Sequence, residues 1–198
     1  IMVIKELFPL PVLLHEFDSF LVKKIKDLVI PRLDVFSKED YKTPPTVETD
    51  FFSERIIDLN EIPEFVEELN KCKNEFEKIV GCHPSFLVDY WVQNYRKDQY
   101  HDTHNHGRVE IAGVYFIQAN DQAGEFQLFS PNPNISIFLE DSGKDNKTPF
   151  NQPVQSIKPK EGGLILFPGY VDHRVLPGGS NCIRTSLAFN FHPIFFDK

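Results

Sequence analysis

The chain has 198 residues, and its 29 acidic and 21 basic residues give a net charge of −8. This length suffices for one hydrophobic core, so we predict a single domain over residues 1–198. The acidic balance argues against non-specific binding to nucleic acid or anionic lipid. The three cysteines are scattered singly and no apolar run approaches the roughly 20 residues of a membrane span, so we expect a cytoplasmic protein without a disulfide framework.

The pattern of residues 1–84 predicts a helical region that supports the rest of the domain. Asp18 is suited to cap a first helix that has one apolar face. A second helix follows Asn60, and Gly81 is suited to end it. The lysines of both helices, Lys73 among them, lie among acidic residues, which predicts a solvated outer face. The apolar positions of the second helix recur at spacings of three and four: Ile62, Phe65, Leu69, Cys72, Phe76 and Ile79.

Residues 85–198 change to short runs rich in β-branched and aromatic residues, separated by turns. Such a series predicts an all-β core of the sandwich or barrel type. The polar segment 141–153 contains one glycine and two prolines, and it is either a lid over this core or an ordinary connector. The expected strands are residues 86–95, 111–119, 125–129, 135–139, 163–167 and 184–191.

Four of the seven histidines lie in two short segments next to predicted strands. Imidazole is the commonest metal ligand in proteins and suits iron, zinc and copper. Side chains two residues apart in an extended chain point the same way, so His104 and His106 can converge on one ion while His101 falls in the other register. The more distant His173 would complete a facial set of three and leave coordination positions open.

The same histidines are compatible with two alternatives. Residues 100–107 could be a polar surface turn that happens to contain imidazoles. Three histidines and a water molecule also describe a catalytic zinc site. The residues that accompany the histidines have to separate these possibilities.

The last predicted strand carries polar side chains on one face. Period-two alternation places Arg184, Ser186 and Asn190 together, so a polar row faces a pocket, and we expect all three to contribute to cofactor binding. A guanidinium matches a carboxylate with two hydrogen bonds, and Ser186 can add a third. The alternative is an arginine that pairs with a surface acid, but the nearby His173 favours carboxylate binding.

A series of short motifs runs through the β-rich part of the chain. In order they are His-x-His at 104–106, Gly-Val-Tyr-Phe at 113–116, Gly-Glu-Phe at 124–126, Gly-Gly-Leu-Ile-Leu-Phe-Pro at 162–168, His173 and Arg-Thr-Ser at 184–186. Together they resemble the Fe(II)- and 2-oxoglutarate-dependent oxygenases, most closely the prolyl-hydroxylase-like branch and, within it, oxygenases of marine bacteria and tailed phages. The resemblance covers roughly residues 86–192 and rests on the combination. It implies a double-stranded β-helix, a jelly-roll or cupin-like fold with iron at its open end.

The resemblance also implies a role for individual residues. His104 and His173 match the two histidines that bind iron in the family. Arg184 and Ser186 match the pair that holds the far carboxylate of 2-oxoglutarate. Tyr115 lies near the strand position from which this branch directs a tyrosine toward the same carboxylate.

The chain departs from the family pattern at one ligand. The family usually has aspartate or glutamate two residues after the first histidine, where this chain has His106. Three neutral histidines would leave a ferrous site with two positive charges instead of one, a situation similar to that in some cupin-type dioxygenases. Asp102 shares the register of His104 and His106, so it is the alternative third ligand or a partner that orients one of the ligands.

The function implied by the resemblance is oxygenation that depends on Fe(II), 2-oxoglutarate and O2. Decarboxylation of 2-oxoglutarate to succinate would be coupled to hydroxylation of a substrate, for which the acidic charge favours a protein side chain or a metabolite. The location would be the cytoplasm, or the host cytoplasm if the protein is phage-encoded. Two alternatives are a cupin-like metal enzyme that does not use 2-oxoglutarate, in which Arg184 is structural, and a non-catalytic metal-binding or assembly module.

Overall fold

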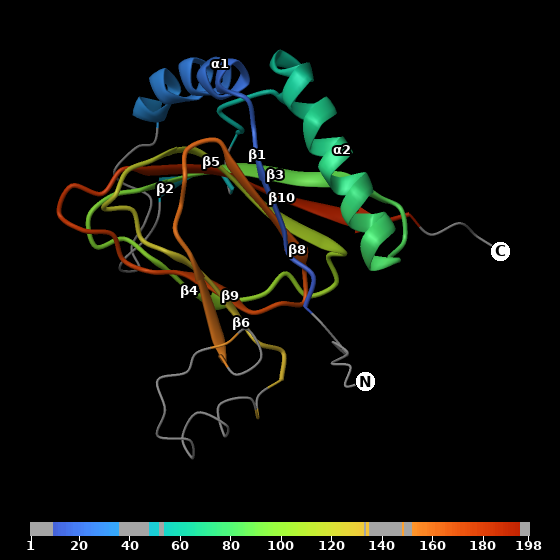
Figure 1. Ribbon diagram of the computed structural model, residues 1–198. Helices are drawn as coiled ribbons and strands as arrows, with labels where there is room; N and C mark the ends of the chain where they lie inside the picture. Colours follow the sequence, from blue (N-terminus) through green and yellow to red (C-terminus); the bar gives the residue numbers. More distant parts are fainter. Residues whose placement is uncertain are drawn as a thin grey trace.

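A computed structural model of the chain contains ten described strands and two α-helices (Figure 1). The described residues are 10–35, 48–51, 54–132, 134, 148 and 152–194. The strands are β1 (Leu13–Glu16), β2 (Glu48–Thr49), β3 (Ser85–Tyr95), β4 (His101–His104), β5 (Ile111–Ala119), β6 (Phe126–Phe129), β7 (Val154–Ile157), β8 (Gly163–Pro168), β9 (His173–Val175) and β10 (Arg184–Pro193). The α-helices are α1 (Ser19–Val29) and α2 (Pro63–Val80), and short 3₁₀ helices cover Ile30–Val35 and Leu59–Glu61.

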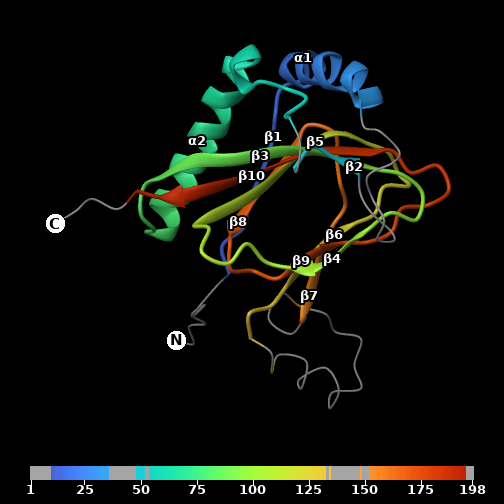
Figure 2. The same ribbon diagram turned by 180° about the vertical axis from the view of Figure 1, so that it is seen from behind.

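The strands form two sheets that face each other. Within the described ranges, six strands form one sheet in the order β1-β8-β5-β10-β3-β2, and four form the other in the order β4-β9-β6-β7. All paired strands within these sheets are antiparallel. Both helices lie over the outer face of the six-stranded sheet, and the four-stranded sheet lies on the other side, as the view from behind also shows (Figure 2). This arrangement confirms the predicted double-stranded β-helix with N-terminal helices.

The helix boundaries follow from capping chemistry. The Asp18 carboxylate accepts hydrogen bonds from two backbone N–H groups of the first turn of α1, at 2.9 and 3.0 Å. Pro63 opens α2, where its missing N–H costs nothing. Gly81 ends α2 in the left-handed region with φ of 73°, which glycine adopts without strain. Both helix ends that Asp18 and Gly81 predict are confirmed.

Two residues of α2 differ from expectation. Ile79 is 70% exposed, because the buried face of the helix ends at Phe76. Lys73 is buried, and its ammonium lies 3.0 Å from a Glu77 carboxylate oxygen and donates to the Ser85 carbonyl at 2.8 Å. The end of α2 therefore meets the start of β3 through a covered ion pair instead of a solvated face.

The six-stranded sheet is buried on both faces. Toward the helices, Tyr115 of β5 and Phe189 of β10 pack in one core with Phe17 and Phe65. Toward the smaller sheet lies a second core whose buried members are Tyr95, Ala112, Val114, Phe116, Phe126, Leu128, Ile165, Phe167, Val171 and Val175. Alternate residues of one strand thus belong to different cores, and the second core lies next to the histidines.

One predicted strand and most of the candidate lid lie outside the residues that the structure describes. The expected strand at 135–139 lies outside the described residues, as does the candidate lid at 141–153 apart from 148, 152 and 153. Five strands of two to four residues were not among the expected strands, namely β1, β2, β4, β7 and β9. β4 and β9 carry three of the four clustered histidines, namely His101, His104 and His173.

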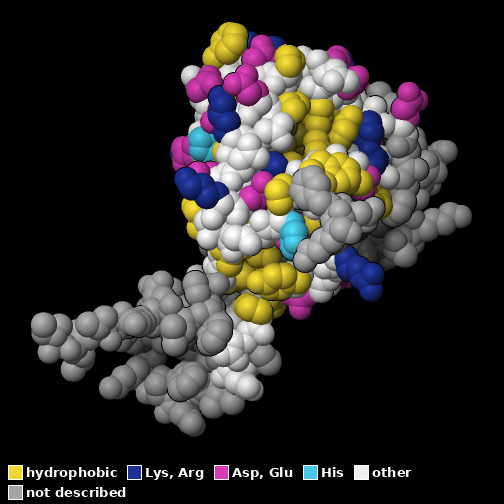
Figure 3. Space-filling model, turned by 90° about the vertical axis from the view of Figure 1, so that its right-hand side faces the viewer, with side chains coloured by type: hydrophobic (Ala, Val, Ile, Leu, Met, Phe, Trp, Pro, Cys, Tyr) yellow, Lys and Arg dark blue, Asp and Glu magenta, His cyan; other side chains and the backbone are white. Residues whose placement is uncertain are grey.

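One face of the molecule carries charged side chains of both signs (Figure 3). On the face that Figure 3 shows, acidic and basic side chains alternate around apolar areas instead of forming a region of one sign. Among the described helices, none combines the length and apolar character needed to cross a membrane.

Candidate metal centre

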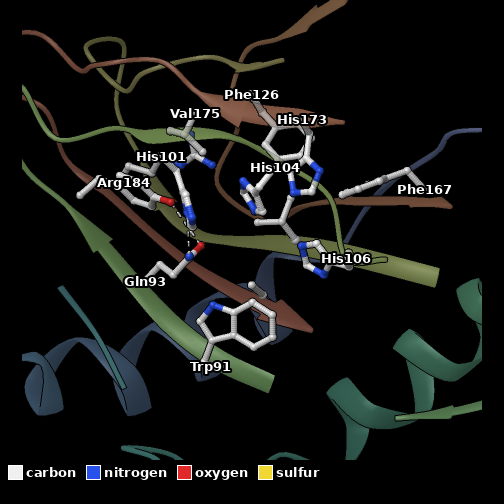
Figure 4. Close-up of a pocket in the computed structure, with 14 residues that line it drawn as sticks. Trp91, Gln93, His101, His104, His106, Phe126, Phe167, His173, Val175 and Arg184 are labelled. Carbon is white, nitrogen blue, oxygen red and sulfur yellow. Dashed lines mark hydrogen bonds between the residues drawn. The ribbon is translucent and has the colours of Figure 1, made fainter. Parts of the chain in front are cut away.

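Three histidines converge between the two sheets (Figure 4). Each of His104, His106 and His173 offers one ring nitrogen, and these three atoms lie within 4.8 Å of one another. Strand pairing brings two of them together, since His104 is the direct cross-strand partner of His173 in the β4–β9 pair. His106 follows the end of β4, and its backbone N–H donates to the Gly169 carbonyl at 2.8 Å. The two histidine segments of the sequence therefore meet at one point.

Each of the three imidazoles is oriented by a hydrogen bond at Nδ1. His104 Nδ1 donates to the Asp102 backbone carbonyl at 2.7 Å, and His173 Nδ1 donates to the Val171 carbonyl at 2.9 Å. His106 Nδ1 is hydrogen-bonded to the side-chain oxygen of Asn190. Because these oxygens can only accept, Nδ1 carries the proton and Nε2 keeps its lone pair in all three rings. This is the arrangement that metal-binding histidines usually have.

The cluster is held in its neutral form. Burial lowers the pKa of His104, His106 and His173, and for His173 burial together with the neighbouring His104 brings the pKa to about 3. Neutral imidazole is the form that coordinates a metal ion. The donor set therefore fits a divalent transition metal without prior loss of protons near neutral pH.

A fourth histidine extends the site toward the interior. The His101 ring stacks on that of His104 with centroids 4.1 Å apart, and Gln93 lies 3.5 Å from His101 Nδ1. The Tyr95 hydroxyl donates to the Gln93 side-chain oxygen at 3.3 Å. Burial lowers the pKa of His101 to about 4 and raises that of Tyr95 to about 12, so both are neutral near pH 7. All three side chains line the same pocket as the histidine cluster and Arg184, and Figure 4 shows His101 and Gln93 on the side of the pocket where Arg184 lies.

Arg184 lies at the inner end of the same pocket and is 1% exposed. One terminal nitrogen donates to the Gly124 carbonyl at 2.9 Å, and its guanidinium lies over the rings of Tyr95 and Phe116 at 4.8 and 5.1 Å from their centroids. Its Nε has no hydrogen-bond partner among the described residues. Burial lowers its pKa, but arginine keeps its charge in proteins. A buried cation of this kind requires an anion to compensate it.

Two other members of the predicted polar row lie on the same strand face. The hydroxyl of Ser186 is completely buried and has no hydrogen-bond partner within the described part of the chain. Asn190 lies further along β10 and contacts His106 instead of the inner end of the pocket. The structure thus places Asn190 where it orients the His106 ring, and its contribution to cofactor binding stays a prediction.

The prediction for Tyr115 is wrong. Its ring lies 4.9 Å from that of Phe17 and 5.1 Å from that of Phe65, centroid to centroid, on the helical side of the sheet. It therefore points away from the pocket that Arg184 and the histidines line. The alternation of β5 directs Val114 and Phe116, not Tyr115, toward the pocket side.

The alternative ligand Asp102 acts through its backbone. Its side chain is exposed and does not belong to the group of atoms that could hold a metal. Its carbonyl oxygen nevertheless accepts the Nδ1–H of His104, so the expected orienting role falls to the peptide group.

Sequence reasoning missed the contribution of β3. Trp91, Gln93 and Tyr95 all line the pocket, and they share one strand face by period-two alternation. The Trp91 ring stacks near His106 with centroids 6.1 Å apart. The alternation was visible in the sequence, but which face of the strand points inward was not.

The fold is a double-stranded β-helix, and the site between its two sheets offers three histidine nitrogens to a metal ion. The family model described as "Putative 2OG-Fe(II) oxygenase" matches residues 89–190, just over half of the chain. The chain belongs to this family of 2-oxoglutarate- and Fe(II)-dependent oxygenases. No curated protein matches it.

Solved structures share the fold at low sequence identity. A Pseudomonas putida prolyl-4-hydroxylase aligns over 94% of this chain and 94% of its own, with a TM-score of 0.60 and 15% identity. HygX from Streptomyces hygroscopicus, solved with nickel and 2-oxoglutarate, aligns over 94% and 84% with a TM-score of 0.61 and 15% identity. A viral collagen prolyl hydroxylase from Paramecium Bursaria Chlorella virus-1, solved with 2-oxoglutarate, aligns over 91% and 96% with a TM-score of 0.58 and 16% identity.

Proposed function

We propose that this protein is an Fe(II)- and 2-oxoglutarate-dependent hydroxylase in which His104, His106 and His173 hold the metal. The observation that carries the proposal is that one pocket holds both a set of free metal-binding nitrogens and a buried cation without an anion. At the mouth stand three imidazoles with free Nε2 lone pairs, and at the inner end stands a buried arginine whose Nε is unpaired among the described residues. A dicarboxylic oxoacid suits both ends, because it can chelate the metal with one end and neutralise Arg184 with the other.

Residues of β10, of β3 and of the turn before β6 would together bind this cosubstrate. Arg184 would hold the far carboxylate, and the buried hydroxyl of Ser186 would donate a further hydrogen bond. Tyr95 takes the role first expected for Tyr115, since its ring lies beside the guanidinium and its hydroxyl is on the pocket side. Gly124 fixes the other side of Arg184 through its carbonyl. The guanidinium would thus be positioned before the cosubstrate arrives, which limits the entropy lost on binding.

The chemistry is supplied by the bound groups, and the protein controls its surroundings. Fe(II) and 2-oxoglutarate, when bound, supply an oxidising reaction in which O2 is consumed, 2-oxoglutarate yields succinate and CO2, and a substrate C–H bond is hydroxylated. Phe126 and Phe167 pack against His173 and exclude water from its side of the site. Trp91 closes the opposite side of the site, where its ring lies next to that of His106. Protein control of this kind is mainly positioning and exclusion of side reactions.

An anaerobic titration tests the proposal. Fe(II) followed by 2-oxoglutarate should produce the visible metal-to-ligand charge-transfer band of the chelate, and admission of O2 should yield succinate. No band would contradict the use of 2-oxoglutarate and favour a cupin-like enzyme or a metal-binding module. A band without any succinate, even from slow turnover without substrate, would contradict the oxygenase chemistry.

Arg184→Ala separates cosubstrate binding from metal binding. Loss of a buried charge-assisted pair should weaken 2-oxoglutarate by at least about tenfold, while the affinity for Mn(II) changes by less than about threefold. Arg96→Ala is the matched control, since Arg96 pairs with Glu48 at the surface. Equal losses of 2-oxoglutarate and metal affinity in Arg184→Ala would count against the assignment.

A further inference from the structure

A second group of metal-ligating side chains lies on the helical side of the six-stranded sheet. It consists of His15 on β1 and of Glu68 and Cys72 on α2, and their three ligand atoms lie within 4.8 Å of one another. His15 Nε2 and Glu68 Oε1 are 3.1 Å apart. This cluster has no role in the pocket described above, which opens on the other side of the sheet.

Local structure accounts for the meeting of the three side chains. Glu68 and Cys72 are four residues apart and therefore adjacent on one face of α2. His15 alternates with neighbours of β1 so that its ring points toward the helices, where it contacts the edge of Phe17 at 5.3 Å between centroids. Lys71 lies 3.4 Å from the other oxygen of Glu68, which leaves Oε1 directed at His15.

The cluster is open on one side and closed on the other. The side chains of His15 and Glu68 are 34% and 33% exposed, whereas Cys72 is 7% exposed. A cation can thus arrive from solvent and find a thiol at the floor of the site. One coordination position would remain for water on the open side.

The chemical types of the three donor side chains indicate which metal ion the cluster would bind. Imidazole, carboxylate and thiol are the three side-chain types that bind zinc, at bond lengths of about 2.0–2.3 Å. For tetrahedral geometry such bonds place nitrogen and oxygen donors about 3.3 Å apart, close to the observed 3.1 Å between His15 and Glu68. Hard cations such as Mg²⁺ would not accept the sulfur ligand.

We propose that His15, Glu68 and Cys72 form a Zn(II) site that links the edge strand β1 to α2. The thiol gives its proton to solvent as the sulfur–zinc bond forms, and the thiolate and carboxylate together neutralise the dication. Burial and the charge of Glu68 raise the pKa of Cys72 to about 11, so this thiol is protonated in the absence of metal and zinc has to displace the proton. The alternative is a simple His15–Glu68 ion pair beside a packed cysteine.

Cobalt(II) spectroscopy of the 198-residue chain separates the zinc site from the ion pair. Co(II) bound by a thiolate has an intense near-ultraviolet charge-transfer band, and no cysteine lines the histidine pocket among the described residues. We expect this band to appear in the wild-type protein with a stoichiometry of one and to disappear on addition of Zn(II). Cys72→Ser should abolish the band, while the weaker visible bands of cobalt at the three-histidine centre remain.

Two further variants control the assignment. Cys82→Ser, which removes a partly buried cysteine elsewhere, should leave the band unchanged. His15→Gln alters a partly exposed side chain and should weaken Co(II) binding at this site by at least about tenfold without unfolding the protein. A wild-type protein with no band, or a band that survives Cys72→Ser, would overturn the proposal.

Discussion

Residue His106 occupies the position at which the resemblance leads us to expect a carboxylate. The three rings are neutral, so a bound divalent metal would keep two positive charges instead of one. Asn190 compensates in part, because its side-chain oxygen accepts the Nδ1–H of His106 and places partial negative charge behind the ring. The orientation of this candidate ligand therefore depends on a residue of the opposite sheet.

Asn190→Ala should weaken metal binding by about ten- to a hundredfold, since the His106 ring loses the acceptor that fixes its tautomer. Titration with Mn(II), followed by calorimetry, measures the effect. Asn190→Asp keeps an acceptor at the same position and should retain most of the affinity. Unchanged binding in Asn190→Ala would mean that His106 is held by packing alone.

Metal-free protein should lose stability as the pH falls below about 6.5. His173 and His101 have pKa values of about 3 and 4 in the folded protein, and unfolding restores the ordinary value near 6.5, so the unfolded state binds more protons. The free energy of unfolding is therefore highest above pH 6.5 and falls toward pH 4, by about 1.4 kcal/mol per pH unit for each histidine. Thermal unfolding with EDTA between pH 7.5 and 5 tests this.

The matched variant for that experiment is His101→Gln. It should show a shallower fall of Tm with decreasing pH than the wild-type protein. Because this substitution leaves the other histidines in place, the difference between the two slopes reports His101 alone. A wild-type Tm that is constant over this range would contradict the neutral, buried state of the cluster.

At the scale of elements, the turn that precedes β6 supports the inner end of the pocket. Gly124 offers its carbonyl to Arg184, and a Cβ at this residue would lie 1.8 Å from the backbone oxygen of Leu176. Neither of these two backbone segments can move aside easily, because the Leu176 N–H donates to the Glu125 carbonyl at 2.9 Å. A side chain at Gly124 would therefore displace the anchor of Arg184.

Gly124→Ala should weaken 2-oxoglutarate by more than about tenfold and lower the Tm. Isothermal titration with Mn(II) present measures the cosubstrate affinity. Gly107→Ala is the control, because a Cβ there meets nothing within 4 Å and only its φ of 60° adds a cost of about 1 kcal/mol. If both variants lost 2-oxoglutarate equally, the effect would be one of general stability.

The strands and the metal centre show which features of the fold could be predicted from the sequence. The bounds of β5 and the starts of α1 and β10 follow from caps, turns and apolar runs, and His104, His106 and His173 were grouped because two of them share one short segment. The face of Tyr115 could not be derived, because β5 is buried on both sides and its apolar run shows no alternation. β4, β7 and β9 have only three or four residues, too few for a periodic signal.

At the scale of the whole molecule, the helical region and the β core share one hydrophobic cluster. Phe65 of α2 is completely buried between Phe17 and Tyr115. We therefore keep the prediction of a single domain and expect the helices and the sheets to unfold together.

Phe65→Ala should lower stability by about 3–5 kcal/mol and still give one unfolding transition. Differential scanning calorimetry tests both statements, through the shift of Tm and the agreement of calorimetric and van't Hoff enthalpies. Phe20→Ala is the control, since Phe20 is 76% exposed and should change stability by less than about 0.5 kcal/mol. Two separate transitions would show that residues 1–84 form an independent unit.

The position of Trp91 has a practical consequence. It is the one tryptophan of the chain, and its indole lies beside His106. Its fluorescence therefore comes from a single place in the molecule, within reach of quenching by a paramagnetic ion such as Mn(II) or Fe(II) held by the three histidines. Metal loading, cosubstrate entry and the arrival of a candidate substrate can each be followed as a change in that emission, in the unlabelled wild-type protein and before any product has been identified.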